Sequence, residues 1–336
     1  PLAGADLIAM EEAQDSHEVV LALLARQNIP VLMFGDPMQA LAWEAPFRDQ
    51  SHPLQERGQR YVMSRSYRFG EGVASALSAL LHKAGDEQID TVTSTGVSNV
   101  RGGEALDAWR LEGRHYAVIA RSRWSLFSEA LHAFEQHRVA GWVDGIESPA
   151  YQIATLFDLA CLAVASHFEG SGRWHAQISN TWIMRTGSLE AARLALAKRQ
   201  NANGVASCDW VAQHLTPQLA QIIADWRAHD AKRQEAIRCG QQQVARRDMT
   251  MATVPLAKGH EWSRVFVHDD LVSPGILSEW PCVDATTQRQ LRWLYTALSR
   301  AQVEVAVPDR LLEHFAAHGR LIEPADPSLC DVEADH

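Results

Sequence analysis

The chain has 336 residues, 46% of them hydrophobic, so it can bury one or two cores, and two domains is the better expectation. Its formal charge of -10 gives no global sign of a nucleic-acid binder, although an acidic protein can still carry a local basic groove. The five cysteines include no CxxC pair, which argues against a disulfide framework and a zinc site. Early acidic residues and the lack of ~18 consecutive apolar residues argue against a signal peptide and a membrane span. We therefore expect a soluble, cytoplasmic protein.

Short apolar runs alternate with helical patterns in the first half of the chain. Strands are predicted at 5–10, 29–36, 59–66 and 115–122, and helices at 19–27, 71–83, 125–137 and 151–165. The segment 86–105 is polar and contains glycine, so we expect a surface loop there. This alternation is typical of an α/β fold built on a parallel sheet.

The pattern changes to helices alone between 168 and 245. Apolar residues repeat there at three and four, as in Leu215, Leu219, Ile222, Ile223 and Trp226. Strand signals return at 249–254, 263–270 and 303–308, with a helix over 289–300. We therefore expect a first domain at 1–56, a second domain made of 57–167 and 246–312, a helical insertion at 168–245 and a tail at 313–336.

Two carboxylates, Glu11 and Glu12, follow the first predicted strand. Ligands bind at the carboxyl ends of strands in open α/β sheets, so one acid can hold Mg²⁺ while the next orients an attacking water. The alternative is an ordinary solvated start of a helix.

A Gly-Asp-Pro turn ends the second predicted strand and places Gln39 beyond the edge of the sheet. Gln39 can contact a terminal phosphate from that position. The ring of Trp43 can stack on a base, a contact worth about 1–3 kcal/mol. The alternative for Trp43 is an ordinary position in the core.

Three further segments carry candidate residues. Arg68 lies between two aromatic residues, and its guanidinium suits a phosphate, although such an arginine is often a surface residue. Lys258 and Gly259 form a turn between two predicted strands, with Glu261 at the start of the second, and glycine there lets the backbone approach a ligand. Arg300 lies at the exit of a helix, just before a strand. Each of these segments by itself also has a purely structural interpretation.

The order of these features is more specific than any one of them. An acid pair, Gly-Asp-x-x-Gln, Tyr-Arg, Lys-Gly-x-Glu-Trp and Tyr-x-Ala-x-Ser-Arg-Ala follow one another at domain-scale spacing. In this order they resemble motifs II to VI of superfamily 1 DNA helicases of the UvrD/Rep/PcrA type. The wording "SYRFG" and "AKGHEWSRVFVHDDL" is most similar to the F-box DNA helicase branch. The resemblance extends from Leu7 to about Pro308, and it implies an α/β fold with two RecA-like P-loop NTPase lobes. The first lobe is incomplete, and the second carries the helical insertion.

The resemblance also implies roles for individual residues. Glu11 occupies the position of the Mg²⁺ ligand, although the family usually has Asp there, and Glu12 that of the catalytic acid. Gln39, Arg68 and Arg300 occupy catalytic, nucleotide-binding positions, and Glu261 lies near the nucleotide. The positions that line single-stranded DNA are Trp43, Arg121, Ser122, Thr253 and Lys258. The implied cofactors are ATP and Mg²⁺, the implied partners are single-stranded DNA and duplex junctions, and the implied polarity is 3′ to 5′.

These helicases carry a phosphate loop, G-x-x-x-x-G-K-[ST], upstream of the acid pair, whereas no Lys in this chain is followed by Ser or Thr. We therefore expect a fragment of a longer helicase that by itself hydrolyses ATP poorly or not at all, with Leu7 to Phe34 on an incomplete sheet. One alternative is a non-catalytic helicase-like module that binds DNA or a partner protein. Another is an unrelated α/β enzyme that uses the acid pair alone, but it leaves the Arg68 and Arg300 motifs unexplained.

Overall fold

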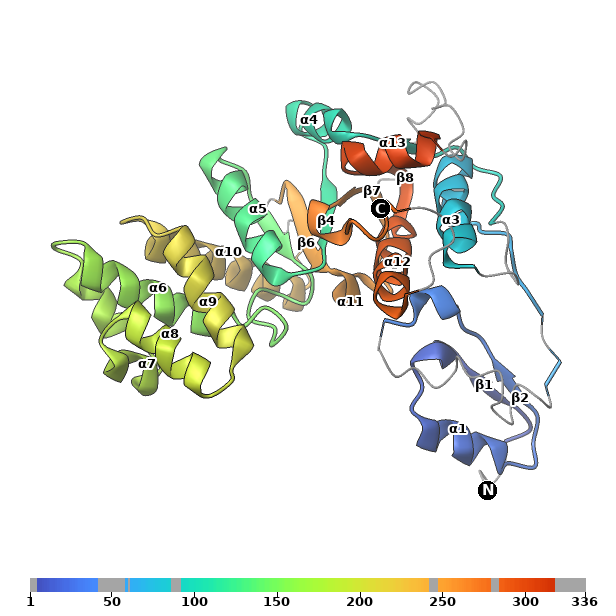
Figure 1. Cartoon of the computed structure of the whole chain (residues 1–336), viewed down its shortest axis with the longest axis horizontal. Coiled ribbons are helices and arrows are strands. Elements are labelled where there is room, and N and C mark those ends of the chain that lie inside the picture. The colour runs from blue at the N-terminus through green and yellow to red at the C-terminus, as the bar shows by residue number, and fades with distance from the viewer. Residues whose placement is uncertain are drawn as a thin grey trace. The chain divides into compact units, whose positions relative to one another are not determined.

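The computed structural model describes residues 5–41, 58–59, 61–85, 92–241, 247–278 and 284–317 (Figure 1). They form a mixed α/β fold with a parallel six-stranded sheet, in the order β3-β8-β7-β4-β6-β5, and a separate parallel pair, β1-β2. The chain divides into two compact units. Unit 1 comprises Pro1–Arg121 and Ala252–His336, and unit 2 comprises Ser122–Met251, so unit 1 is discontinuous in sequence.

The first strands of unit 1 are short. Strands β1 (Ile8–Met10) and β2 (Val31–Met33) pair in parallel, and α1 (Glu18–Ala25) connects them. Short 3-10 helices, η1 (Ala13–Asp15) and η2 (Pro37–Gln39), follow the two strands. Helix α1 is apolar on almost every side, but Leu21 is its one residue counted as buried among those the structure describes. A two-stranded sheet is only marginally stable by itself, so this region depends on its neighbours for stability.

Four strands of the six-stranded sheet belong to unit 1, namely β3 (Asn99–Arg101), β4 (Tyr116–Ala120), β7 (Trp262–Val267) and β8 (Ala301–Ala306). Helices α3 (Glu71–Ala84) and α12 (Ala285–Leu298) pack against each other and against this sheet, as Figure 1 shows. β4 is buried along its whole length, which explains its continuous apolar sequence. Helix α12 also contacts η2 and so connects the two sheets of unit 1.

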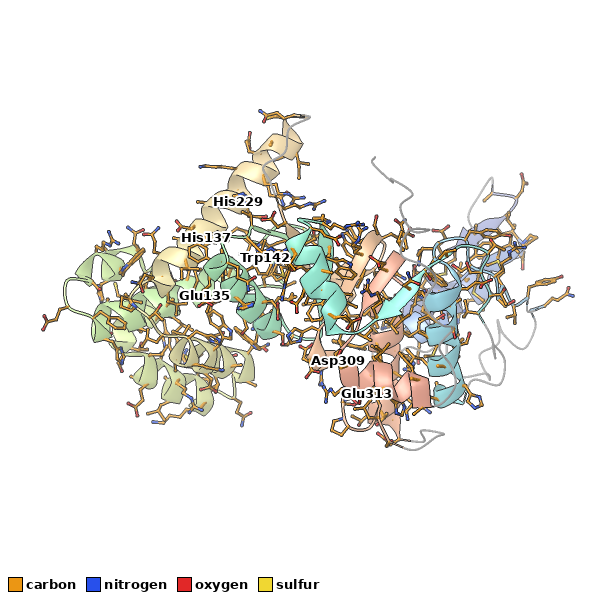
Figure 2. The ribbon with its side chains drawn as sticks, turned by 90° about the horizontal axis from the view of Figure 1, so that it is seen from above. Glu135, His137, Trp142, His229, Asp309 and Glu313 are labelled. Carbon is orange, nitrogen blue, oxygen red and sulfur yellow. The ribbon has the colours of Figure 1, made fainter. Side chains whose placement is uncertain are left out.

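A buried carboxylate connects α4 (Gly103–Leu111) to the same sheet. Glu304 of β8 is 6% exposed and accepts hydrogen bonds from Trp109 Nε1 at 3.0 Å and from Arg264 Nε at 3.2 Å. Asp309, at the start of α13 (Asp309–Ala317) and labelled in Figure 2, accepts a bond from the Gly103 backbone N–H at 2.8 Å. Because buried charges are costly unless they are bonded, these contacts fix the position of α4.

Unit 2 combines two strands with a group of helices. β5 (Ala140–Trp142) pairs with the first residues of β6 (Met249–Thr253), and α5 (Arg123–Glu135) precedes them. The helices that follow are α6 (Ile153–His167), η4 (Gly172–Gln177), α7 (Thr181–Thr186), α8 (Leu189–Lys198), α9 (Ala202–Gln213) and α10 (Leu219–Arg238). Thus the described part of 168–245 is helical, as the sequence predicts.

Aromatic residues form the core of unit 2. Trp142, labelled in Figure 2, has its ring centroid 5.6 Å from that of Phe127, 5.0 Å from that of Tyr151 and 6.3 Å from that of Trp226. The Tyr151 hydroxyl lies 3.2 Å from the Val143 carbonyl oxygen, and burial raises the pKa of this phenol. Packed aromatic pairs add about 0.5–1.5 kcal/mol each beyond the area they bury, so this cluster holds α5, β5 and α10 together.

Two expectations about local structure are wrong. The predicted strand at 59–66 is absent from the residues described there, apart from an isolated bridge between Arg65 and Thr93, and Tyr61 and Met63 are exposed. Its apolar side chains have no sheet to pack against. The predicted surface loop at 86–105 instead contains strand β3 and the start of α4, with Asn99 and Val100 buried; residues 86–91 lie outside the described part.

None of the helices in the described residues is both long and apolar enough to cross a membrane.

Candidate functional site

The candidate nucleotide residues lie where two sheet edges of unit 1 meet. Glu12 follows β1 and Gln39 follows β2, so both lie at the carboxyl edge of the small sheet. Glu261 directly precedes β7 and Arg300 directly precedes β8, so both lie at the amino edge of the large sheet. Arg300 Nη2 donates to Gln39 Oε1 at 3.0 Å, across 261 positions of sequence. This bond joins the two edges.

A chain of hydrogen bonds runs from the acid pair to that contact. Glu12 Oε2 accepts from Gln14 Nε2, and Gln14 Oε1 accepts from the Asp36 backbone N–H at 3.1 Å. Asp36 Oδ2 in turn accepts from Gln39 Nε2 at 2.8 Å. Because Gln39 uses its NH₂ toward Asp36, its carbonyl oxygen is directed to Arg300. We call this series, Glu12, Gln14, Asp36, Gln39 and Arg300, the polar relay.

Arg300 is a buried cation at the end of the relay. It is 2% exposed, and its guanidinium also donates to Ser299 Oγ at 2.9 Å and to the Thr296 carbonyl oxygen at 3.2 Å. Burial, together with repulsion from Arg68, lowers its pKa to about 10, against attraction from Glu261, Glu12 and Asp36. Burial likewise raises the pKa of Asp36, opposed by its bonds to Gln39 and Met38. These charged groups therefore lie close enough to influence one another.

Arg68 approaches the same place from the segment before α3. Its Nε forms an ion pair with Glu261 Oε1, and Gln302 Nε2 donates to Glu261 Oε2 at 3.1 Å. The Arg68 side chain is 33% exposed, so solvent and ligands can reach it. Beside it the ring of Tyr67 is 83% exposed and lies under the Arg65 guanidinium, whose Cζ is 5.2 Å from the ring centroid. An exposed ring next to a cation is suited to stacking on a base.

Glu12 has an unusual backbone conformation, with φ 51 and ψ 40 in the left-handed region. Residues other than glycine rarely adopt it, and when they do they are often at functional sites. Glu11, the predicted metal ligand, is exposed beside it. Among the residues that the structure describes, no group of three or more His, Cys, Asp or Glu side chains is arranged to hold a metal ion. Any metal here therefore needs ligands in addition to these two acids.

Lys258, predicted to line DNA, forms an ion pair with Asp15 of η1. The Gly259 after it has φ 77, a conformation that glycine adopts without strain. The structure thus places Lys258 near the acid pair, where it links the turn before β7 to the small sheet.

Two other predicted DNA contacts in unit 1, Arg121 and Thr253, lie at a different edge of the large sheet from Arg300. In unit 1, Arg121 follows β4 and Thr253 ends β6, so both are at the carboxyl edge of the large sheet, about 20 Å from its amino edge for a six-residue strand. Arg121 is exposed, and its backbone N–H donates to Asp270 Oδ1 at 2.9 Å. Ser122, in unit 2, caps α5 by accepting from the Ser125 N–H. Trp43 lies outside the described residues.

The sequence interpretation missed Gln14 and Asp36 as parts of the site. The glycine at position 35 was the sequence feature that could have indicated them, because a Cβ atom there would lie only 2.6 Å from Gln14 Oε1. Glycine at this position lets the second strand's exit approach Gln14 closely. The Gly-Asp turn is therefore needed for the relay as well as for ending the strand.

Comparison with known proteins gave no assignment, since no protein-family model matches the chain and no curated protein matches it.

Proposed function

We propose that this chain is part of an ATP-dependent, UvrD-like DNA helicase of superfamily 1. Its two RecA-like lobes would bind nucleotide between them and hold single-stranded DNA. The first lobe is represented by the β1-β2 region, and the second by the large sheet with its helical insertion. ATP and Mg²⁺ are the cofactors, single-stranded DNA and duplex junctions the partners, and 3′ to 5′ the direction of movement. A cytoplasmic or, in a eukaryote, nuclear location fits this activity.

The observation that supports this proposal most is the bond between Gln39 and Arg300. It brings a glutamine at the carboxyl edge of one sheet to an arginine at the amino edge of another, with Glu12 and Arg68 close enough to shift the pKa of Arg300. Two arginines and an acid around one point match what phosphoryl transfer requires, because charge spreads over the transferring group and water must be oriented.

In this mechanism the residues exchange partners. Arg68 is held by Glu261, and Arg300 by Gln39 and Ser299. A polyphosphate competes for both guanidinium groups, because it offers Arg300 a charged acceptor in place of the neutral Gln39 amide and offers Arg68 an anion other than Glu261. Arg300 then leaves Gln39, and the relay transmits this change to Glu12 through Asp36 and Gln14. Binding and release at this point thus alter the contact between the two sheets of unit 1.

The residues present fit magnesium only as a nucleotide-bound ion. Mg²⁺ in such sites keeps several waters and takes one or two carboxylates together with substrate phosphates, so Glu11 or Glu12 can supply the protein ligand. The ion would offset phosphate charge.

Nucleotide binding to the full chain tests the proposal. We expect a non-hydrolysable ATP analogue with Mg²⁺ to bind, single-stranded DNA to change that affinity, and Arg68→Gln to weaken nucleotide binding about tenfold or more. Arg310→Gln is the matched control, since Arg310 likewise forms an ion pair with a carboxylate, Asp269, but at the carboxyl edge of the large sheet. Equal affinities for wild type and Arg68→Gln would remove Arg68 from the site.

A non-catalytic module is the second candidate, because the 336 residues contain no Lys followed by Ser or Thr and hence no phosphate loop. It predicts that single-stranded DNA or a partner protein binds while nucleotide does not. If neither nucleotide nor single-stranded DNA binds the chain, the helicase proposal is wrong.

A further inference from the structure

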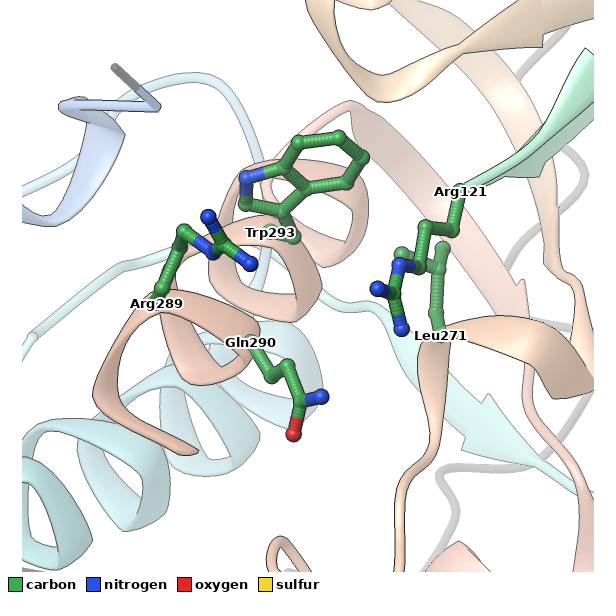
Figure 3. A pocket seen from close by; sticks show the side chains of 5 residues that line it. All are labelled: Arg121, Leu271, Arg289, Gln290 and Trp293. Atoms are coloured by element: carbon green, nitrogen blue, oxygen red, sulfur yellow. The ribbon is translucent and has the colours of Figure 1, made fainter. Parts of the chain in front are cut away.

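A small cavity in unit 1, of about 190 Å³, lies at the carboxyl edge of the large sheet. Its lining residues come from three elements: Arg121 after β4, Leu271 of η5 (Asp269–Leu271), and Arg289, Gln290 and Trp293 of α12. Residues three and four apart on a helix share one face, which explains why these α12 side chains meet at the cavity. Figure 3 shows Arg289 and Arg121 on opposite sides, with Trp293 and Gln290 between them.

The polar groups at this cavity are suited to donating hydrogen bonds. Arginine and the tryptophan indole carry donors and no acceptor. The Gln290 amide oxygen already accepts a bond from Ser273 Oγ, so its NH₂ is the end able to meet a ligand. None of the lining residues that the structure describes is acidic. The natural occupant is therefore rich in acceptors and negatively charged.

The ring of Trp293 supplies part of the cavity wall. It lies between the two arginines, as Figure 3 shows. Leu271, 3% exposed, gives the cavity an apolar wall, which strengthens polar contacts by excluding water.

We propose that this cavity binds a single phosphate group, with Arg121, Arg289 and the Gln290 NH₂ as its donors. Its volume is below the roughly 300–1,000 Å³ of pockets for drug-sized ligands, so it accommodates a phosphate and not a whole nucleotide. Donors on opposite sides suit a tetrahedral anion better than a planar carboxylate.

This phosphate site is separate from the polar relay. Arg289 and Arg300 are eleven residues apart along α12 and the turn after it, which corresponds to about 16 Å along a helix. The cavity lies instead on the same edge as Arg121 and Thr253. The proposal does not depend on nucleotide binding, so it can fail or succeed independently of the proposed function.

The indole N–H resonance of Trp293 in ¹⁵N-labelled full-length chain tests this site. The resonance is assigned as the one that disappears in Trp293→Phe. We expect inorganic phosphate to shift it saturably at constant ionic strength, whereas chloride does not. Arg121→Gln and Arg289→Gln should each raise the phosphate dissociation constant about tenfold or more, the loss expected for one charge-assisted hydrogen bond. Arg292→Gln is the matched control, because Arg292 lies on the same helix but does not line the cavity.

A short single-stranded oligonucleotide distinguishes the two sources of phosphate. If the strand shifts the same resonance and inorganic phosphate competes with it, the occupant is a backbone phosphate, and Arg289→Gln should lower the salt dependence of DNA binding by about one unit. If inorganic phosphate alone shifts it, the occupant is a small phosphorylated molecule. A resonance that responds to neither, or that responds in both arginine variants with the wild-type dissociation constant, overturns the proposal.

Discussion

Replacing Arg300 with methionine tests whether this arginine serves nucleotide binding or the stability of the fold. Methionine keeps much of the side-chain volume and removes the charge. The fall of the Arg300 pKa from 12.5 to about 10 means that its surroundings, burial first, disfavour the cation by roughly 3 kcal/mol. Removing it relieves that penalty but leaves Gln39 Oε1, Ser299 Oγ and the Thr296 carbonyl oxygen without this donor, at a cost of about 1 kcal/mol each. The two effects are of similar size, so we expect Arg300→Met to change the free energy of unfolding by less than about 2 kcal/mol.

The same variant should lose nucleotide affinity. A charge-assisted hydrogen bond to phosphate is worth about 1.5–3 kcal/mol, so affinity should fall about ten- to a hundredfold. Urea unfolding at pH 7 and a titration with a fluorescent ATP analogue measure the two quantities. Arg310→Met is the control, because Arg310 bonds Asp269 and the Val272 carbonyl oxygen at the far edge of the sheet. An Arg300→Met protein that is more than about 2 kcal/mol less stable, yet binds nucleotide normally, would refute this reasoning.

Three further outcomes are expected. Glu12→Gly should raise the melting temperature or leave it unchanged, because glycine tolerates φ 51, whereas Glu12→Val should lower it; a higher melting temperature for the valine variant would contradict the assigned backbone conformation. Cys239 is exposed, whereas burial raises the pKa of the Cys161 thiol to about 12 and that of the Cys208 thiol to about 11. In thiol modification at pH 8, Cys239→Ser should therefore remove one thiol from the fast phase, and Cys161→Ser should leave the fast phase unchanged. Burial raises the pKa of Asp36 above its ordinary value of 3.8, so the folded state binds this proton more tightly than the unfolded state. Stability should therefore fall as pH rises from 3.8 through the raised pKa. Asp36→Asn should flatten this part of the pH–stability curve measured by urea unfolding, and an unchanged slope would count against burial of the charge.

The sequence predicted the regular elements with continuous apolar runs. Strands β4, β7 and β8 and helix α12 are confirmed, because each buries a long apolar face that its sequence pattern displays. Strand β3 was missed because it has three residues, two of them polar, and is buried by partners distant in sequence. Pattern alone carries no information on such partners.

The sequence predicted several residues of the candidate site but not the hydrogen bonds between them. Gln39 and Arg300 were candidates from their segments, yet the bond between them depends on how two sheets meet. Gln14 and Asp36 were missed because the contact between them needs the parallel register of β1 and β2. Trp293 was not predicted as a site residue. The pattern of α12 indicated only the buried face with Leu291, Leu294 and Leu298, and it gave no indication of a cavity on the other face.

The discontinuity of unit 1 has a consequence for how this protein can vary. The chain leaves unit 1 after Arg121 and returns at Ala252, and the polar relay lies entirely outside the segment between them. The entropy lost in closing a flexible loop grows only logarithmically, by about 0.6 kcal/mol for each doubling of its length. The helices α6 to α10 of unit 2 contribute no strand to the sheet, so they can differ in length at little loop-closure cost to the residues that meet at Arg300, whereas β5 and β6 belong to the six-stranded sheet itself. New binding preferences can therefore arise in these helices while the polar relay keeps its contacts.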